Sequence, residues 1–188
     1  MKVHLASRFF NRRNLLLIGL TAFLASVSMH SVTPVLAADK SIDSTTYSNY
    51  TNNKYYLVFC ARSGTVGHAF VVWGSEDSSQ GKSTSEAFGF YPRQGRGVLE
   101  RVPGAVRNEA FSGKMNFITD RLIVQVDKSA YDRTQEAISA WSTTNYNLFD
   151  INCINFVMSV ARDAGLQVPS RSAITSPSSY VQALINAN

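Results

Sequence analysis

The residue best placed to do chemistry in this 188-residue sequence is Cys153, at the start of a predicted helix over 153–164. Asn152 is suited to cap this helix, and Gly165 predicts its end. A thiol in the first turn lies near unpaired N–H groups and the positive end of the helix dipole, and both favour the nucleophilic thiolate. The helix is predicted by small or apolar residues that recur at the spacing of one helix face, at Cys153, Phe156, Val157, Val160, Ala161 and Ala164.

His68 is the base that such a thiol would need. It opens a predicted strand after a turn that contains Gly67. The two other histidines, His4 and His30, lie within residues 1–37, which predict a signal peptide that is removed from the mature chain. His68 would remove the proton from Cys153 and later protonate the leaving group. The sequence has neither the set of about four His/Cys ligands typical of zinc nor the Gly-x-Ser-x-Gly elbow of serine hydrolases, so we expect no metal and no cofactor.

Two interpretations without catalysis fit the same residues. A single histidine beside Ala69 and Phe70 could be a hydrogen-bonded structural residue. In an exported protein with two cysteines, Cys60 and Cys153 could also form a disulfide, which would leave an inactive, disulfide-stapled secreted binding module. Against the disulfide, Cys60 lies in an apolar run, where a free thiol packs as a small hydrophobic group.

Residues 1–37 predict a signal peptide. A basic start that ends in Arg12 and Arg13 precedes an apolar stretch over about 15–27, which is short for a bilayer, and a small-residue cleavage pattern ends at Ala37. The arginine pair also resembles a twin-arginine export signal, and an uncleaved anchor is the alternative. We therefore expect an exported protein, periplasmic or extracellular, whose mature chain does not span the membrane.

Removal of this segment changes the charge of the chain. The whole sequence has 18 basic and 13 acidic residues and a net charge of +5, but the segment 1–37 holds four basic residues and no acidic one. The mature chain would keep 14 basic and 13 acidic residues. This near-neutral balance gives no support to nucleic-acid binding.

The rest of the chain predicts one α+β domain. Residues 38–53 are polar and predict a flexible leader, and residues 54–188 are enough for a single core. The order of elements predicts an antiparallel sheet of about four strands packed against helices, with the cysteine helix near the C-terminus. The glycine-containing stretch 92–117 is either a functional flap or a misread element. The predicted strands cover 55–61, 68–73, 86–91 and 121–126, and further helices begin at Ser129 and Ser176.

Four short motifs resemble those of circularly permuted papain-like thiol enzymes, the lecithin:retinol acyltransferase-like branch of the NlpC-like superfamily. In that branch the histidine strand comes first and an Asn-Cys-x-x-Phe helix closes the domain. The resemblance covers about residues 54–185 and implies a permuted papain-like fold with Cys153 as nucleophile and His68 as base. The motifs are Gly67-His68-Ala69-Phe70, Phe88-Gly89-Phe90-Tyr91-Pro92, Tyr146-Asn147-Leu148 and Asn152-Cys153-Ile154-Asn155-Phe156-Val157.

The same resemblance implies a polar residue on the strand after the histidine, which would orient the imidazole. This sequence departs from the pattern, because Phe88, Gly89 and Phe90 stand where that residue is expected. Glu86 and Tyr91 are the candidates that remain on this strand.

Further site residues follow from the position of Cys153. Its backbone N–H could stabilise the oxyanion of a tetrahedral intermediate, together with the side chain of Tyr146 or Asn147. We expect the arginines within 92–107 to be solvated, with an anionic substrate group as their alternative partner. Candidate substrate contacts are Asn152, Tyr91 and Trp73, although Asn152 is also the expected helix cap.

These residues predict a cysteine hydrolase, of amidase or peptidase type, that forms a thioester intermediate on Cys153. Because the protein is expected to be exported, cell-envelope peptides such as those of peptidoglycan are the first candidate substrates. A lipid acyl hydrolase or acyltransferase of the same fold is the alternative enzyme. The inactive disulfide-stapled module is the alternative without catalysis.

Overall fold

The computed structural model describes residues 38–45, 53–94, 99–109 and 117–188. These residues belong to one unit, Val35–Asn188. The predicted signal peptide, residues 1–37, lies outside the described residues, as does the segment 46–52 of the predicted leader. None of the helices described has the length and apolar character needed to cross a bilayer.

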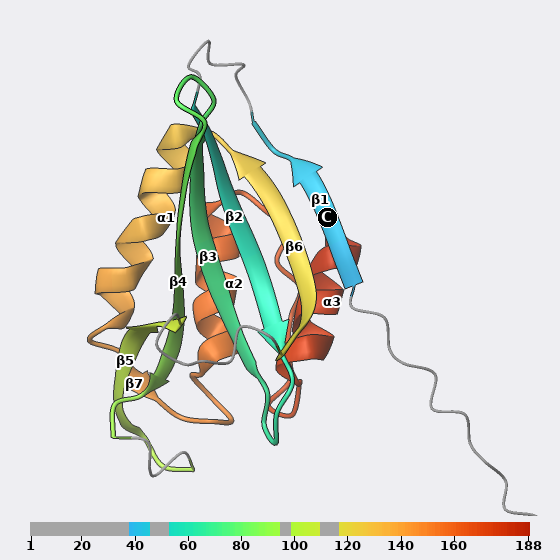
Figure 1. Ribbon diagram of the computed structural model, residues 1–188. Coiled ribbons are helices and arrows are strands. Elements are labelled where there is room, and N and C mark those ends of the chain that lie inside the picture. The colour runs from blue at the N-terminus through green and yellow to red at the C-terminus, as the bar shows by residue number, and fades with distance from the viewer. Residues whose placement is uncertain (1–37, 46–52, 95–98, 110–116) are drawn as a thin grey trace, which may run out of the picture. The chain divides into compact units, whose positions relative to one another are not determined.

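A seven-stranded sheet forms one layer of this unit (Figure 1). Its spatial order is β1-β6-β2-β3-β4-β5-β7, and every neighbouring pair is antiparallel except β1 and β6, which run parallel. The consecutive strands β2, β3 and β4 form the predicted antiparallel meander. The strands are β1 Ala38–Asp43, β2 Asn53–Arg62, β3 His68–Asp77, β4 Lys82–Pro92, β5 Val102–Asn108, β6 Ile118–Val126 and β7 Asn145–Tyr146.

Three helices cover one face of the sheet (Figure 1): α1 Lys128–Trp141, α2 Cys153–Asp163 and α3 Pro177–Ala187. Side chains alternate between the two faces of a strand. On β2, Leu57 and Phe59 therefore join the core beneath the helices, whereas Cys60 joins a smaller cluster with Phe70 and Ala87 on the other face. The helices contribute apolar side chains to this core. Those from α2 form a stripe along the helix: Cys153, Ile154, Phe156, Val157, Val160 and Ala161.

The predicted α+β class, the antiparallel pairing and the cysteine helix near the C-terminus are confirmed, but the strand count was too low. Strand β5 lies inside the stretch 92–117, which was therefore in part a misread element. Pro103 and Gly104 hid it, because both residues are uncommon inside strands. Here β5 lies between β4 and the short β7, and the position of Gly104 leaves room for the ring of Phe90.

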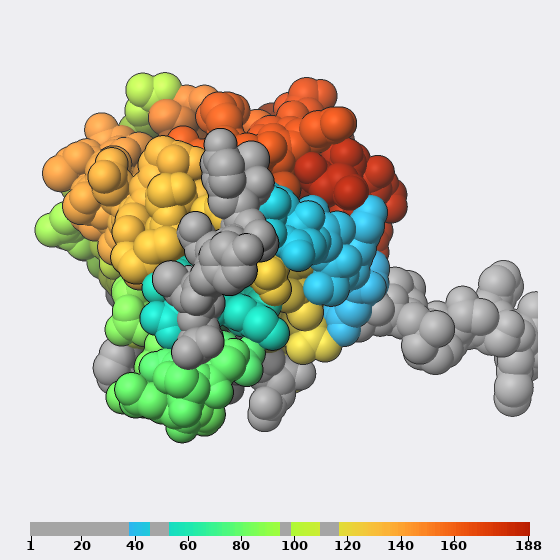
Figure 2. All heavy atoms as spheres, turned by 90° about the horizontal axis from the view of Figure 1, so that it is seen from above, coloured from blue at the N-terminus to red at the C-terminus, as the bar shows by residue number. Residues whose placement is uncertain are grey.

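The predicted flexible leader is wrong for residues 38–43, which form β1 at the edge of the sheet. Its partly buried residues, Ala38 and Ile42, pack against the core. Strand β1 also lies beside α3 at the surface (Figure 2). There Lys40 Nζ donates a hydrogen bond to the carbonyl of Ile185 at 3.2 Å. An ion pair between Asp39 and Arg121 adds a link to β6.

Candidate active site

Cys153 is the first residue of α2, as the sequence predicted. Asn152 caps the helix through its Oδ1, which accepts the N–H of Ile154 at 2.9 Å, and Asn155 Oδ1 in turn accepts the N–H of Asn152 at 3.1 Å. This reciprocal capping box fixes the first turn. Gly165 has a φ of +82°, which is the left-handed conformation expected just after the helix. The cap therefore holds the thiol at a defined position, where it is 6% exposed.

The thiol of Cys153 lies next to the imidazole of His68, the first residue of β3, so that each group shifts the pKa of the other. Burial by itself raises the pKa of Cys153, but the charge and hydrogen bond of His68, with the N–H groups of Ala69 and Ile154, lower it below the usual thiol value. Burial likewise lowers the pKa of His68, whereas the Cys153 thiolate and Glu109 raise it, and the net shift is upward. Both directions favour a thiolate–imidazolium pair.

Glu109 is the carboxylate that holds His68, and the sequence analysis did not single it out. Its Oε1 lies 3.0 Å from Nε2 of His68 and accepts the hydroxyl of Tyr91 at 2.6 Å. Its Oε2 accepts Nη1 of Arg62 at 2.5 Å. Although this carboxylate is fully buried, which raises its pKa, the contacts with His68, Tyr91 and Arg62 lower the pKa below the usual value. Since Nε2 faces Glu109, Nδ1 is the ring nitrogen left to face Cys153.

Gly89 explains how a carboxylate from β5 reaches across β4. In the register of the sheet, Gly89 lies opposite Phe70, and Glu109 follows directly after Asn108, the last residue of β5. A Cβ atom at position 89 would lie 2.3 Å from Oε1 of Glu109 and 2.3 Å from Nε2 of His68. Any side chain here would occupy the space in which the two groups meet. The missing polar residue on β4 is therefore replaced by a glycine that admits a carboxylate from the next strand.

The three other predicted residues of β3 and β4 have different roles. Glu86 is exposed and pairs with Trp73 in the sheet, away from His68, so it is not the orienting residue. Trp73 is 1% exposed and donates its Nε1–H to Thr134 at 3.0 Å, so it belongs to the core and not to a substrate surface. Tyr91 does belong to the site, because its ring stacks on His68 with the centroids 4.2 Å apart.

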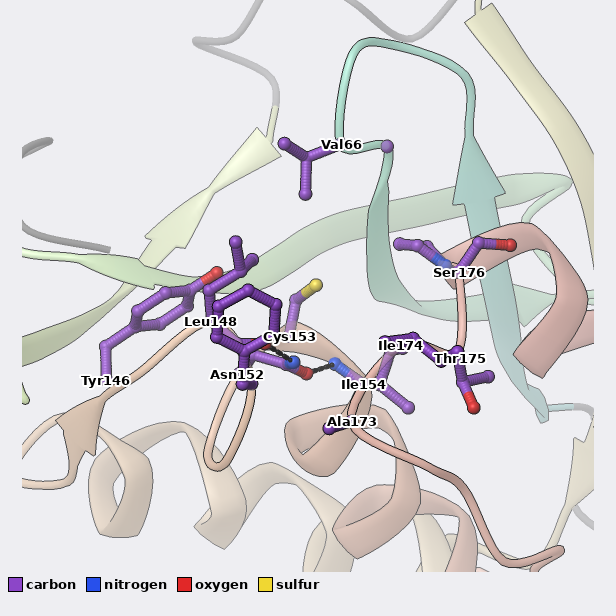
Figure 3. Close-up of a pocket in the computed structure, with 13 residues that line it drawn as sticks. Val66, Tyr146, Leu148, Asn152, Cys153, Ile154, Ala173, Ile174, Thr175 and Ser176 are labelled. Atoms are coloured by element: carbon purple, nitrogen blue, oxygen red, sulfur yellow. Dashed lines mark hydrogen bonds between the residues drawn. The ribbon is translucent and has the colours of Figure 1, made fainter. Parts of the chain in front are cut away.

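A pocket of about 280 Å³ opens beside Cys153 (Figure 3). Figure 3 shows the sulfur directed into the space bordered by Val66, Leu148 and Ser176. Asn152 also lines it, so this residue is both a helix cap and a pocket wall. The sulfur of Cys153 therefore borders a space in which a small ligand could lie.

Tyr146, rather than Asn147, is placed to assist the backbone N–H of Cys153 at an oxyanion. Tyr146 lines the pocket, and burial raises the pKa of its hydroxyl, as does the nearby Cys153, so the hydroxyl stays protonated and can donate. Asn147 is already engaged, because its Nδ2 donates to the carbonyl of Leu99 and its Oδ1 accepts two backbone N–H groups. The Cys153 N–H is at the first helical position, where α-helical geometry provides no acceptor.

The two cysteines are both free, so the predicted disulfide alternative is wrong. Cys60 packs on the sheet face opposite the helices, whereas Cys153, on α2, belongs to the core between the helices and the sheet. Burial raises the pKa of the Cys60 thiol to about 12. The two thiols therefore differ in their surroundings, which disfavour the thiolate of Cys60 and favour that of Cys153.

The predicted loop arginines that the structure describes bind protein groups. Arg101 pairs with Asp150, Arg93 donates to the carbonyl of Gly104, and Arg107 donates to backbone carbonyls of β4 and the turn after it. None of these arginines lines the pocket beside Cys153. Among the described residues, no three His, Cys, Asp or Glu side chains gather as a possible metal site.

No protein-family model and no curated protein matches the sequence. One solved structure resembles the fold: the type VI secretion system effector TseH. The match has a TM-score of 0.50 and 14% sequence identity, and it covers 71% of this chain and 88% of that chain. At this level of identity the likeness is one of fold: the chain has an α+β architecture similar to that of a secreted effector.

Proposed function

We propose that this protein is an exported cysteine hydrolase of permuted papain-like type, in which Cys153 is the nucleophile, His68 the general base and Glu109 the residue that positions the imidazole. The observation that carries the proposal is the chain of contacts from the Cys153 thiol through His68 to the buried carboxylate of Glu109. The Cys153 end of this chain of contacts lies at an open pocket, where a nucleophile can meet a substrate.

The reaction begins from the thiolate–imidazolium pair. The sulfur of Cys153 attacks the carbonyl carbon of an amide or ester, and the Cys153 N–H and the Tyr146 hydroxyl stabilise the oxyanion. His68 passes its proton to the departing amine or alcohol as the carbon–heteroatom bond breaks, which leaves a thioester. Water then attacks the thioester while His68 takes a proton from that water, and the carbon–sulfur bond breaks, which releases the acid product and restores the thiolate–imidazolium pair.

Glu109 serves this cycle without touching the substrate. It holds the His68 ring by Nε2 and stabilises the positive charge that the ring carries during both halves of the reaction. Arg62 and Tyr91 hold the carboxylate in turn, so its position is fixed before substrate binds. Preorganised groups of this kind lower the barrier because they need no rearrangement when charge develops.

Two substrate classes follow from this chemistry. Cell-envelope peptides suit an exported enzyme, and the likeness to a secreted effector supports export. The alternative, a lipid acyl hydrolase or acyltransferase, is favoured by one specific observation, the apolar lining of the pocket.

A trapping experiment on the full chain tests the chemistry without knowledge of the natural substrate. A p-nitrophenyl ester should acylate Cys153 and release p-nitrophenol, and mass spectrometry of the peptides should locate the acyl group. Cys153→Ser should abolish the acylation, and His68→Ala should slow it by about 100-fold or more near neutral pH. Cys60→Ser is the matched control and should retain it. Acylation that persists in folded Cys153→Ser would overturn the proposal.

A further inference from the structure

The rim of the pocket beside Cys153 is unusually apolar for a surface. Of the large hydrophobic side chains exposed among the described residues, three line this one pocket: Val66, Phe149 and Ile174, which are 57%, 49% and 87% exposed. Scattered single hydrophobic residues on a surface are ordinary, but their convergence on a hollow marks a binding site for an apolar group.

The three side chains come from three separate loops. Val66 lies in the turn between β2 and β3, Phe149 between β7 and α2, and Ile174 between α2 and α3. Figure 3 shows Val66 and Ile174 on the border of the space around the Cys153 sulfur. Segments remote in the sequence therefore place exposed apolar groups around one reactive atom.

Hydrogen bonds hold two of these loops in place. Asn147 Oδ1 accepts the N–H of Phe149 at 2.9 Å and that of the next residue at 3.0 Å, which fixes the turn that presents Phe149. In the other loop, Ser172 accepts and donates backbone hydrogen bonds with Thr175, and Ile174 is presented between them. The apolar rim is thus preorganised.

Apart from the thiolate of Cys153 itself, the described residues that line the pocket include no Asp, Glu, Lys or Arg side chain. Arg171 does not line the pocket, and its guanidinium donates to the Asn155 side chain at 2.7 Å and to the carbonyl of Asp150. A charged substrate group would lose its hydration in this pocket without gaining a partner, which is unfavourable. An aliphatic group would gain free energy from leaving water.

We infer that Val66, Phe149 and Ile174 form a specificity subsite that binds an uncharged aliphatic group attached close to the scissile carbonyl. The group could be an alkyl chain of an ester or an aliphatic side chain of a peptide, since both offer the same surface. This inference deepens the proposed function, because it takes Cys153 as the nucleophile whose substrate the subsite selects.

The first test uses N-alkylmaleimides of increasing chain length, from ethyl to hexyl, on the full chain. Reaction with Cys153 requires the thiolate but no turnover, and reaction of each reagent with glutathione corrects for intrinsic reactivity. The corrected rate should rise by up to about fourfold for each methylene that enters the subsite. A rate independent of chain length overturns the subsite but leaves the nucleophile intact. Lack of reaction of Cys153 with the ethyl reagent overturns the proposed function instead.

Variants place the effect on the named residues. Ile174→Ser and Phe149→Ser should each flatten the dependence of the corrected rate on chain length, because each removes exposed apolar surface from the subsite. Leu99→Ser is the matched control: this leucine is 66% exposed but does not line the pocket. Flattening by Leu99→Ser to the same degree would contradict the assignment.

A second experiment distinguishes the two sources of the aliphatic group. Acyl p-nitrophenyl esters of increasing chain length are compared with peptide anilides that carry leucine or glutamate next to the scissile bond. A rise with chain length identifies an alkyl chain, and preference for leucine over glutamate identifies an aliphatic side chain; either result supports the subsite. Preference for glutamate over leucine, or for acetyl over longer esters, overturns it.

Discussion

Replacement of Glu109 by glutamine removes the negative charge that lies between His68 and Arg62. Glutamine has nearly the same size and can still accept a hydrogen bond from Nε2 of His68 through its amide oxygen. The hydrogen bond therefore remains possible, but the negative charge 3.0 Å from Nε2 is lost. Both partners are buried, at 0% exposed for the Glu109 side chain and 9% for that of His68, so water cannot replace the charge.

The magnitude follows from the difference between a charged and a neutral hydrogen bond. A hydrogen bond to a charged group contributes about 1.5–3 kcal/mol, and a neutral one about 0.5–1.5 kcal/mol. The imidazolium should therefore lose about 1–1.5 kcal/mol of stabilisation, which corresponds to about one pKa unit. The imidazolium stabilises the Cys153 thiolate, so a less stable imidazolium makes the thiolate less stable too. The pKa of the Cys153 thiol should therefore rise by about one unit.

The assay is the pH dependence of Cys153 alkylation by iodoacetamide, followed by peptide mass spectrometry. The pH midpoint of alkylation should lie about one unit higher in Glu109→Gln, so below the parental midpoint the variant should react about tenfold more slowly than the parent protein. Glu86→Gln removes an exposed carboxylate of the same sheet and should react at the parental rate. Thermal unfolding checks that the variant is folded. An unchanged alkylation profile in folded Glu109→Gln would refute the role given to this carboxylate.

Three further changes test other parts of the structure. Gly89→Ala places a methyl group 2.3 Å from both His68 Nε2 and Glu109 Oε1, so the pH midpoint of cysteine alkylation should rise by about one unit; a parental profile would contradict the close approach. Trp73→Phe should leave alkylation unchanged but lower the free energy of unfolding by about 2 kcal/mol, measured in urea, and a loss of reactivity at full stability would return Trp73 to the site. Deletion of residues 38–45 should lower the free energy of unfolding by about 2–4 kcal/mol in the same assay, because the packing of Ile42 and the β1–β6 pairing are lost. An unchanged free energy of unfolding would support the prediction of a flexible leader.

The residues that could be predicted are those whose local pattern carries the information. The start of α2 has a capping residue, an apolar stripe and a glycine stop within one short segment, so the position of Cys153 followed from local rules. His68 could be paired with it by elimination, because it is the one histidine after residue 37. Strands β2 to β4 and β6 carry apolar runs typical of buried strands.

The residues that could not be predicted depend on contacts remote in the sequence. Glu109 reaches His68 from another strand, and the run before it contains Pro103 and Gly104, which disguise β5. One signal was present: a glycine stands on β4 where the resemblance implied a polar group, and such a gap leaves space that a side chain from elsewhere can fill. Strand β1 escaped notice because Ile42 is its only large apolar residue.

The parallel pairing of β1 with β6 has a consequence for how the chain matures. Strand β1 is synthesised first, but its partner emerges from the ribosome only after four other strands, and the helix that carries the thiol comes later still. Pairings between such distant segments close slowly. Nascent or truncated chains that end before α2 already contain the imidazole and its carboxylate but no nucleophile, so reactivity arises only once nearly the whole polypeptide has been made.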